Sequence, residues 1–240
     1  MSNRVVVVTG CAGPAGRATV RRLLDQGEIV VGADASATGL AELAESLDEE
    51  QAGRFHGGIV DLLDHAATSA WAAQVLSEHH QVDGVVHLVG GWRGGKSFTD
   101  NDLADSDWLF ALLVRTLQNV SLAFHDALAA GPVGRFVIIS AMAATAPDPG
   151  SASYAAAKAA AEAWTFALAA SFRKLAGDEA LRPAATALVV KALLTDQMRA
   201  AKPDAKFAGF THVDDLAEVV GGLWERDAEE LNGRRLVLAP

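Results

Sequence analysis

The sequence has little cysteine, few aromatic side chains and a deficit of basic residues. Cys11 is the single cysteine among 240 residues, which excludes an internal disulfide and fits a reducing compartment. Aromatic residues make up 6% of the chain and hydrophobic residues 50%, so we expect one sizeable core of small side chains. The formal net charge of −10 argues against a nucleic-acid partner or an anionic membrane surface.

Long uncharged apolar runs are missing as well. No stretch has the length needed to span a membrane, and residues 1–4 lead directly into a strand-like valine run without a signal-peptide core. These absences predict a cytoplasmic protein with no membrane partner. We also expect no bound metal.

Short β-branched apolar runs alternate with longer helical patterns along the whole chain. Strands that are apolar throughout, rather than alternating, are typical of a sheet buried on both faces. Strand–helix repetition requires parallel strands joined by crossovers. We therefore predict one α/β domain over residues 1–240, a doubly wound, Rossmann-type parallel sheet with helices on both faces. Its seven strands are expected at residues 4–9, 29–33, 54–59, 84–88, 135–140, 185–190 and 235–238. Its helices are expected at 15–26, 37–50, 64–79, 103–130, 152–174 and 213–226.

A glycine-rich loop, residues 9–16, follows the first strand and leads into the first helix. Glycines there permit a tight turn, and the helix N-terminus presents free N–H groups to a pyrophosphate. A glycine cluster also occurs in ordinary strand-to-helix turns. Its position after the first strand favours dinucleotide binding.

Asp34 ends the second predicted strand, where a carboxylate can accept hydrogen bonds from adenosine ribose hydroxyls and repel a 2′-phosphate. No arginine follows it directly, and Gly13 occupies a loop position where a basic residue would favour that phosphate. The sequence therefore predicts NAD rather than NADP. Asp61 follows the third strand and is a candidate for contact with adenine. For both aspartates, capping of the next helix is the alternative.

Tyr154 is the single tyrosine of the chain, and Lys158 follows it four positions later. Residues four apart share a helix face, so both side chains can point into one cleft. A nearby ammonium favours the phenolate and lowers the pKa of a tyrosine from its ordinary value near 10. Ser140 ends an upstream apolar run. The pattern predicts a proton-transfer group; a half-buried helix tyrosine with a polar tip is the alternative.

With these residues in this order, the chain resembles the short-chain dehydrogenase/reductase family over essentially its whole length. The resemblance implies catalytic roles for Ser140, Tyr154 and Lys158: Tyr154 exchanges the substrate proton, Lys158 lowers its pKa and holds the nicotinamide ribose, and Ser140 hydrogen-bonds the substrate oxygen. The spacing from Ser140 to Tyr154 is one residue longer than usual in the family. The implied cofactor-binding set is Gly10, Gly13, Ala15, Gly16, Asp34, Asp61, Leu62, Gly90, Tyr154, Lys158 and Thr195.

Several family signatures are altered. Pro14 replaces the middle glycine of the loop, and the Asn-Asn-Ala-Gly segment after the fourth strand reads His87-Leu88-Val89-Gly90. For His87, a core position is expected over a catalytic one. The asparagine of the long helix before Ser140 is missing: its position falls near Leu113, with Arg115 as the nearest polar neighbour.

The region at about 195–212 lies where the family places its mobile substrate lid. Thr195 matches a threonine that contacts the nicotinamide amide. The alternative role for Thr195 is the N-cap of a helix, and the sequence favours neither. Trp92 either lines a substrate pocket or packs against Phe98. In this family, the long helices at 103–130 and 152–174 build a dimer interface, so a homodimer or homotetramer is the hypothesis.

The predicted function is an oxidoreductase that transfers hydride between NAD(H) and a ketone or secondary alcohol. The alternative is a catalytically impaired relative that binds a nucleotide or metabolite as a sensor or partner protein. A cofactor-free lyase of the halohydrin-dehalogenase type is a third possibility. Proteins of that type have arginine in place of the lysine, so Lys158 counts against it.

Overall fold

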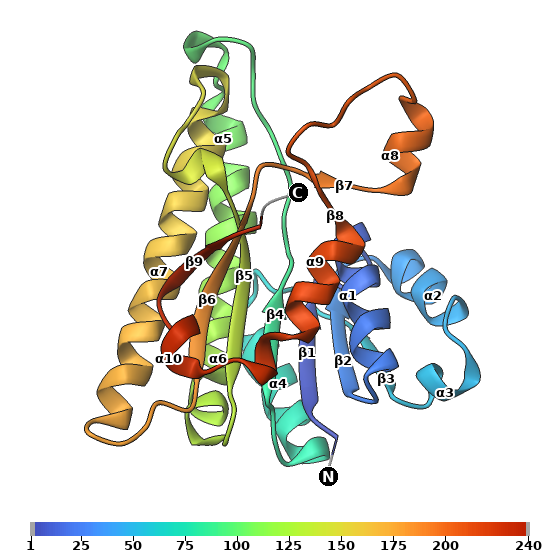
Figure 1. Ribbon diagram of the computed structural model, residues 1–240, viewed down its shortest axis with the longest axis vertical. Coiled ribbons are helices and arrows are strands. Elements are labelled where there is room, and N and C mark those ends of the chain that lie inside the picture. Colours follow the sequence, from blue (N-terminus) through green and yellow to red (C-terminus); the bar gives the residue numbers. More distant parts are fainter. Residues whose placement is uncertain (1–2, 239–240) are drawn as a thin grey trace.

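A seven-stranded parallel sheet forms the centre of the molecule, in the order β3-β2-β1-β4-β5-β6-β9. The computed structural model describes residues 3–238 (Figure 1). The strands are β1 (Val5–Thr9), β2 (Ile29–Asp34), β3 (Phe55–Ile59), β4 (Gly84–His87), β5 (Arg135–Ala141), β6 (Ala184–Val190) and β9 (Arg234–Val237). This order confirms the predicted doubly wound, single-domain fold.

The central strands are apolar on both sides because helices cover both faces of the sheet. All five residues of β1 and all seven of β6 are buried. Helices α4, α6 and α7 pack against one another along one face, whereas α1 packs against α9 (Figure 1). The helices are α1 (Pro14–Asp25), α2 (Ala37–Glu45), α3 (Glu49–Ala52), α4 (His65–His79), α5 (Leu103–Phe110), α6 (Thr116–Ala130), α7 (Ala152–Ala176), α8 (Asp196–Ala201), α9 (Val213–Gly221) and α10 (Ala228–Leu231).

The helix expected at 103–130 is present, but a π-helical segment, η2 (Ala111–Arg115), interrupts it between α5 and α6. The backbone N–H of Thr116 reaches back five residues to the carbonyl of Ala111. Hydrophobic spacing does not reveal such a segment, since both flanking helices keep their own apolar faces.

A second, two-stranded sheet pairs β7 (Leu193–Leu194) with β8 (Thr211–His212), and the sequence did not predict it. Two-residue strands are too short for a period to be recognised. This sheet closes the base of the 195–212 segment, which contains α8 (Figure 1). Within the part of the chain that the structure describes, the helices lack the length and apolar character needed to cross a membrane.

Candidate functional site

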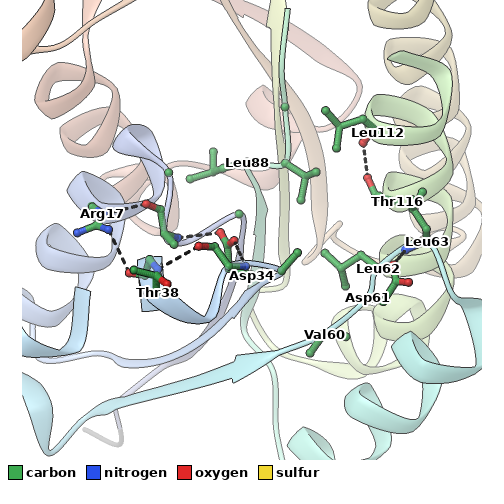
Figure 2. Close-up of a pocket in the computed structure, with 18 of the residues that line it drawn as sticks. Arg17, Asp34, Thr38, Val60, Asp61, Leu62, Leu63, Leu88, Leu112 and Thr116 are labelled. Carbon is green, nitrogen blue, oxygen red and sulfur yellow. Dashed lines mark hydrogen bonds between the residues drawn. The ribbon is translucent and has the colours of Figure 1, made fainter. Parts of the chain in front are cut away.

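The strand order reverses between β1 and β4, and a cavity of about 590 Å³ opens at the carboxyl ends of the neighbouring strands. Such a switch point is where open α/β sheets bind ligands, and this volume is typical of a small-molecule site. Figure 2 shows Arg17, Asp34 and Thr38 in the part formed by the first two strand–helix turns. Leu88, Leu112 and Thr116 lie in the part toward β4 and the long helix.

The glycine loop is packed tightly against its surroundings. Gly10 has a φ of +70°, and a Cβ there would lie 2.9 Å from the backbone of Leu88 and Val89. A Cβ on Gly16 would overlap the carbonyl oxygen of Gly10. Pro14 occupies the first turn of α1, where its missing N–H leaves no intrahelical bond unmade. The loop therefore keeps the close approach of strand, turn and helix that a dinucleotide fold requires.

The carboxylate of Asp34 is held by backbone groups on both sides of the cavity rim. One oxygen accepts a hydrogen bond from the N–H of Ala12 at 3.0 Å, and the other accepts from the N–H of Ser36 at 2.9 Å. The cap of α2 is Ser36, whose hydroxyl accepts from the N–H of Gly39. The capping alternative for Asp34 thus does not apply, and the carboxylate faces the cavity (Figure 2).

Arg17 also lines the cavity, and sequence reasoning missed it. Its guanidinium donates to the carbonyl oxygens of Ala12 at 2.8 Å and Gly39 at 3.1 Å. It forms an ion pair with Glu42 of α2 at 2.8 Å. Arg17 is therefore already engaged by protein groups, although it lies close to Asp34. The separation of Arg17 and Asp34 along the sequence does not indicate that both side chains line the same cavity.

Asp61 lies in the turn after β3, where its side chain accepts a hydrogen bond from the N–H of Leu63 at 3.0 Å. The cap of α4 is Asp64, so Asp61 does not cap that helix. The buried amide of Asn119 donates to the carbonyl of Leu62 at 2.9 Å and so fixes the turn to α6. Asp61 and Leu62 both line the cavity.

A buried chain of polar side chains runs behind the cavity wall. His87 Nδ1 lies 2.7 Å from the hydroxyl oxygen of Thr9, and its Nε2 lies 3.2 Å from that of Thr116. The hydroxyl of Thr116 donates to the carbonyl of Leu112 at 2.6 Å. Because a hydroxyl has one proton, Thr116 accepts from Nε2–H, and Nδ1 accepts from Thr9. Burial, reinforced by the charge of Lys158, lowers the pKa of His87 to about 3, so the imidazole is neutral.

Thr116 is the second residue that sequence reasoning missed. The expected position of the absent asparagine was near Leu113, whereas Leu112 and Thr116 line the cavity and Leu113 is 3% exposed in the core. The π-helical turn shifts which residues of this helix face the site, so an uninterrupted helical period does not single out Thr116. The core position expected for His87 is confirmed.

Tyr154 and Lys158 lie near one another at the start of α7. The ammonium of Lys158 is 5.8 Å from the centre of the Tyr154 ring and donates to the carbonyl of Ile139 at 2.6 Å. Burial lowers the pKa of Lys158 to about 8, opposed by the charge of Glu162, and burial raises the pKa of Tyr154. The side chain of Tyr154 packs beside Leu109, Leu113 and Ala157.

Ser140 is not placed where the sequence predicted it. Its side chain is 1% exposed, and its hydroxyl donates to the carboxylate of Glu162 at 2.5 Å. Successive side chains of a strand point in opposite directions, and the residue at the family's usual spacing from Tyr154 is Ala141, which has no hydroxyl. The hydroxyl of Ser140 is therefore bound within the core to Glu162, and Ser140 does not line the cavity.

Thr195 caps α8, where its hydroxyl accepts from the N–H of Met198 at 3.1 Å, in agreement with the capping alternative. Trp92 and Phe98 are 63% and 71% exposed, so neither is enclosed by the other. In the 195–212 segment, the rings of Phe207 and Phe210 meet edge to face at 5.7 Å.

The structure thus brings six of the predicted cofactor residues together at the cavity and leaves the others outside its lining. The six are Gly10, Gly13, Asp34, Asp61, Leu62 and Gly90. Ala15 and Gly16 lie in the first turn of α1, directly behind the loop. Tyr154 and Lys158 do not line the cavity; the charge of Lys158 contributes to the lowered pKa of His87, and that imidazole contacts Thr116 in the cavity wall.

Comparison with known proteins is consistent with this geometry. The family model described as short chain dehydrogenase matches residues 4–176. Sulfoacetaldehyde reductase 2 of Chromohalobacter salexigens is 28% identical over 165 residues, which cover 68% of this chain and 65% of that protein. The chain therefore spans just under two thirds of this relative, and smaller shares of some other curated relatives.

Solved structures share the fold along nearly the whole chain. A short chain oxidoreductase from Pseudomonas aeruginosa PAO1, described as containing an atypical catalytic center, has a TM-score of 0.84 at 17% identity, covering 98% of this chain and 95% of its own. A gluconate 5-dehydrogenase from Burkholderia cenocepacia, in complex with NADP and tartrate, has a TM-score of 0.82 at 23% identity, covering 100% and 94%. At these identities the likeness shows the fold.

Proposed function

The chain belongs to the short-chain dehydrogenase/reductase family, and on that premise we propose that it transfers a hydride between NAD(H) and a carbonyl compound or its alcohol. The observation that supports the proposal is the Tyr154–Lys158 pair at the start of α7, together with a cavity at the strand switch point that is lined by Gly10, Gly13 and Asp34. A bound nicotinamide supplies the hydride chemistry; the chain's own residues bind it and move the proton.

The cavity fits a dinucleotide. The absence of side chains at Gly10 and Gly16 lets β1, the loop and α1 pack closely together, and the N-terminus of α1 favours the charge of a pyrophosphate. The carboxylate of Asp34 is available at the rim for ribose hydroxyls and would repel a 2′-phosphate. Arg17 does little to offset this repulsion, because its positive charge is already paired with the carboxylate of Glu42. These contacts support NAD over NADP.

Tyr154 is proposed as the acid and base of the reaction. In the free protein its pKa is raised by burial, so the phenol holds its proton at neutral pH and can donate it to a carbonyl oxygen. The ammonium of Lys158 favours the phenolate that remains after donation. Ser140 is not proposed to contact the substrate, because its hydroxyl is bound to Glu162.

The substrate is proposed to be a small aldehyde, ketone or secondary alcohol. Sulfoacetaldehyde reductase and gluconate 5-dehydrogenase, which are similar to this chain, have names that indicate substrates of this kind. The 195–212 segment is proposed as a lid, with Met198, Phe207 and Phe210 as apolar wall residues. The ammonium of Lys191, which precedes this segment in the chain, donates a hydrogen bond to the carbonyl of Ala208 at 2.9 Å.

A homodimer or homotetramer built on the long helices is also proposed. Ala159, Ala163 and Ala167 form an exposed stripe of small side chains on α7, and Leu122 of α6 is 58% exposed. Ala155, expected in the same stripe, is buried instead. Sedimentation at micromolar concentration tests the proposal, and a monomer would contradict it.

Cofactor titration is the decisive experiment for the proposed function. NADH and NADPH are added to the protein while energy transfer from its five tryptophans is followed, and turnover is then measured with a panel of ketones, aldehydes and secondary alcohols. We expect binding of NADH in the micromolar range and weaker binding of NADPH. Absence of binding by either cofactor at millimolar concentration would contradict the proposal.

A catalytically impaired sensor or partner protein is the second candidate. The observation that favours it is Ser140, which does not present a hydroxyl to a substrate, together with Pro14 in the loop. The same experiment separates the two functions. Tight binding of NADH without turnover of any compound in the panel would favour the second.

A further inference from the structure

A buried carboxylate lies directly beneath the proposed catalytic pair. Glu162 follows Lys158 by one turn of α7, is 5% exposed and does not line the cavity. One of its oxygens accepts the hydrogen bond from Ser140 at 2.5 Å, and the other lies 2.8 Å from Nε of Arg235. A charge buried in this way is stable only when it is paired.

Arg235 reaches Glu162 from the last strand of the sheet. It lies opposite Ala187 in the pairing of β9 with β6, and its side chain is 27% exposed. The two groups form an ion pair without a well-aligned hydrogen bond, so the contact is mainly electrostatic. Ser140, Glu162 and Arg235 thus join β5, α7 and β9 at one point.

Glu162 is the acidic neighbour of Lys158 in this region. The groups that face the ammonium are the neutral imidazole of His87 from β4, the carbonyl of Ile139 from β5, and Tyr154 and Glu162 from α7 itself. Of these, Glu162 supplies a negative charge. Residues four apart on a helix share a face, which puts the two charges on the same side of α7.

We propose that Glu162 is a positioning residue that keeps Lys158 protonated beside Tyr154, with Ser140 and Arg235 holding the carboxylate in place. The proposal rests on the proposed function in one respect: the positive charge of Lys158 serves to stabilise the phenolate of Tyr154. Burial lowers the pKa of Lys158 to about 8, and the charge of Glu162 opposes that fall. Without this charge, the pKa of Lys158 would be lower still, because burial alone would act on it.

The two partners of this ion pair have opposite effects on Lys158. Glu162→Gln removes the charge that stabilises the ammonium and leaves the positive charge of Arg235, so the pKa of Lys158 should fall. Arg235→Gln removes a positive charge and leaves the carboxylate unopposed, so that pKa should rise. A purely structural role for the pair predicts no such opposite response, since both substitutions disturb the same packing.

The test is a titration of the lysine side chains by NMR. The chain has six lysines, so [13Cε]-lysine labelling gives few signals, and Lys158→Met assigns the relevant one. In the unsubstituted protein we expect a midpoint at about 8. Glu162→Gln should lower it by about one unit or more, and Arg235→Gln should raise it by a smaller amount. Glu229→Gln, which breaks the exposed pair with Arg173 between α10 and the same α7 helix, is the matched control and should leave the midpoint unchanged.

An unchanged Lys158 midpoint in folded Glu162→Gln protein overturns the proposal. If that variant does not fold, Arg235→Gln decides: a rise supports the proposal, and an unchanged or lowered midpoint overturns it. The NMR titration needs neither cofactor nor substrate. A protein that binds no dinucleotide would therefore contradict the proposed function while the role of Glu162 is judged independently.

Discussion

The open cleft and the buried cluster under Tyr154 are built in different ways. In the cleft, Asp34 ends β2 and Asp61 lies in the turn after β3, and both are held by backbone N–H groups at most two residues away or in the glycine loop. In the cluster, Lys158, Glu162 and Ser140 depend on partners from β5, α7 and β9. Local sequence therefore determines the cleft, whereas tertiary packing determines the charge state of the cluster.

Tyr154→Phe should have the largest effect and separates the two regions most sharply. Removing the phenol deletes the proposed acid and should reduce turnover by about 10²- to 10⁴-fold. Affinity for NADH should stay within about twofold, because the cleft is built from other residues. Steady-state kinetics and fluorescence titration measure the two quantities. Turnover within tenfold of the unsubstituted protein would exclude Tyr154 as the acid.

The pH dependence of carbonyl reduction should report on the cluster alone. The pKa of Lys158 is about 8 in the folded protein, so its charge is complete below this pH and is lost as the pH rises through it. We expect kcat/KM to be nearly flat from pH 6 to 7.5 and to fall by about tenfold per unit well above pH 8. Affinity for NADH, measured in parallel, should change less. A rate of reduction that rises between pH 8 and 9 would contradict this assignment.

Glu42→Gln should change the cleft without affecting the cluster. The substitution removes the carboxylate that offsets the charge of Arg17, so the cleft becomes less negative and affinity for NADPH should increase by about fivefold relative to NADH. Glu45→Gln, on an exposed position of the same helix, is the matched control. Equal changes in the two variants would show that Glu42 has no specific part in cofactor choice.

Ser140→Ala should have the smallest effect on turnover, about threefold or less. Loss of a hydrogen bond that stabilises a developing charge on a substrate would cost about 10²- to 10³-fold, and the position of Ser140 predicts no such loss. The free energy of unfolding should fall by about 2 kcal/mol, since a buried hydrogen bond to a carboxylate is lost. Ser121→Ala, at another buried serine, gives the comparison for stability. A hundredfold loss of turnover would restore Ser140 to the substrate site.

The sequence predicted the fold and six of the residues that line the cleft, because these depend on short-range patterns. Apolar strands, the glycine loop and the strand-end aspartates are all recognisable within a few residues of one another. Ser140 was misplaced by a single position, and a shift of one residue in a strand reverses the side-chain direction. Arg17 and Glu162 were missed because their partners, Glu42 and Arg235, are 25 and 73 positions away along the chain, and no periodic pattern connects them.

The π-helical segment Ala111–Arg115 has a consequence for how this chain is aligned with others. Such a segment places one extra residue in a helical turn, which rotates everything after it by about 100° relative to an uninterrupted α-helix. Thr116, which lines the cleft, and Asn119, which binds its flanking turn, both follow this segment in the chain. Deletion of one residue within the segment would restore a regular helix and turn both side chains away. An alignment with a chain that lacks this segment therefore needs a gap at this point to pair residues that occupy the same place in space.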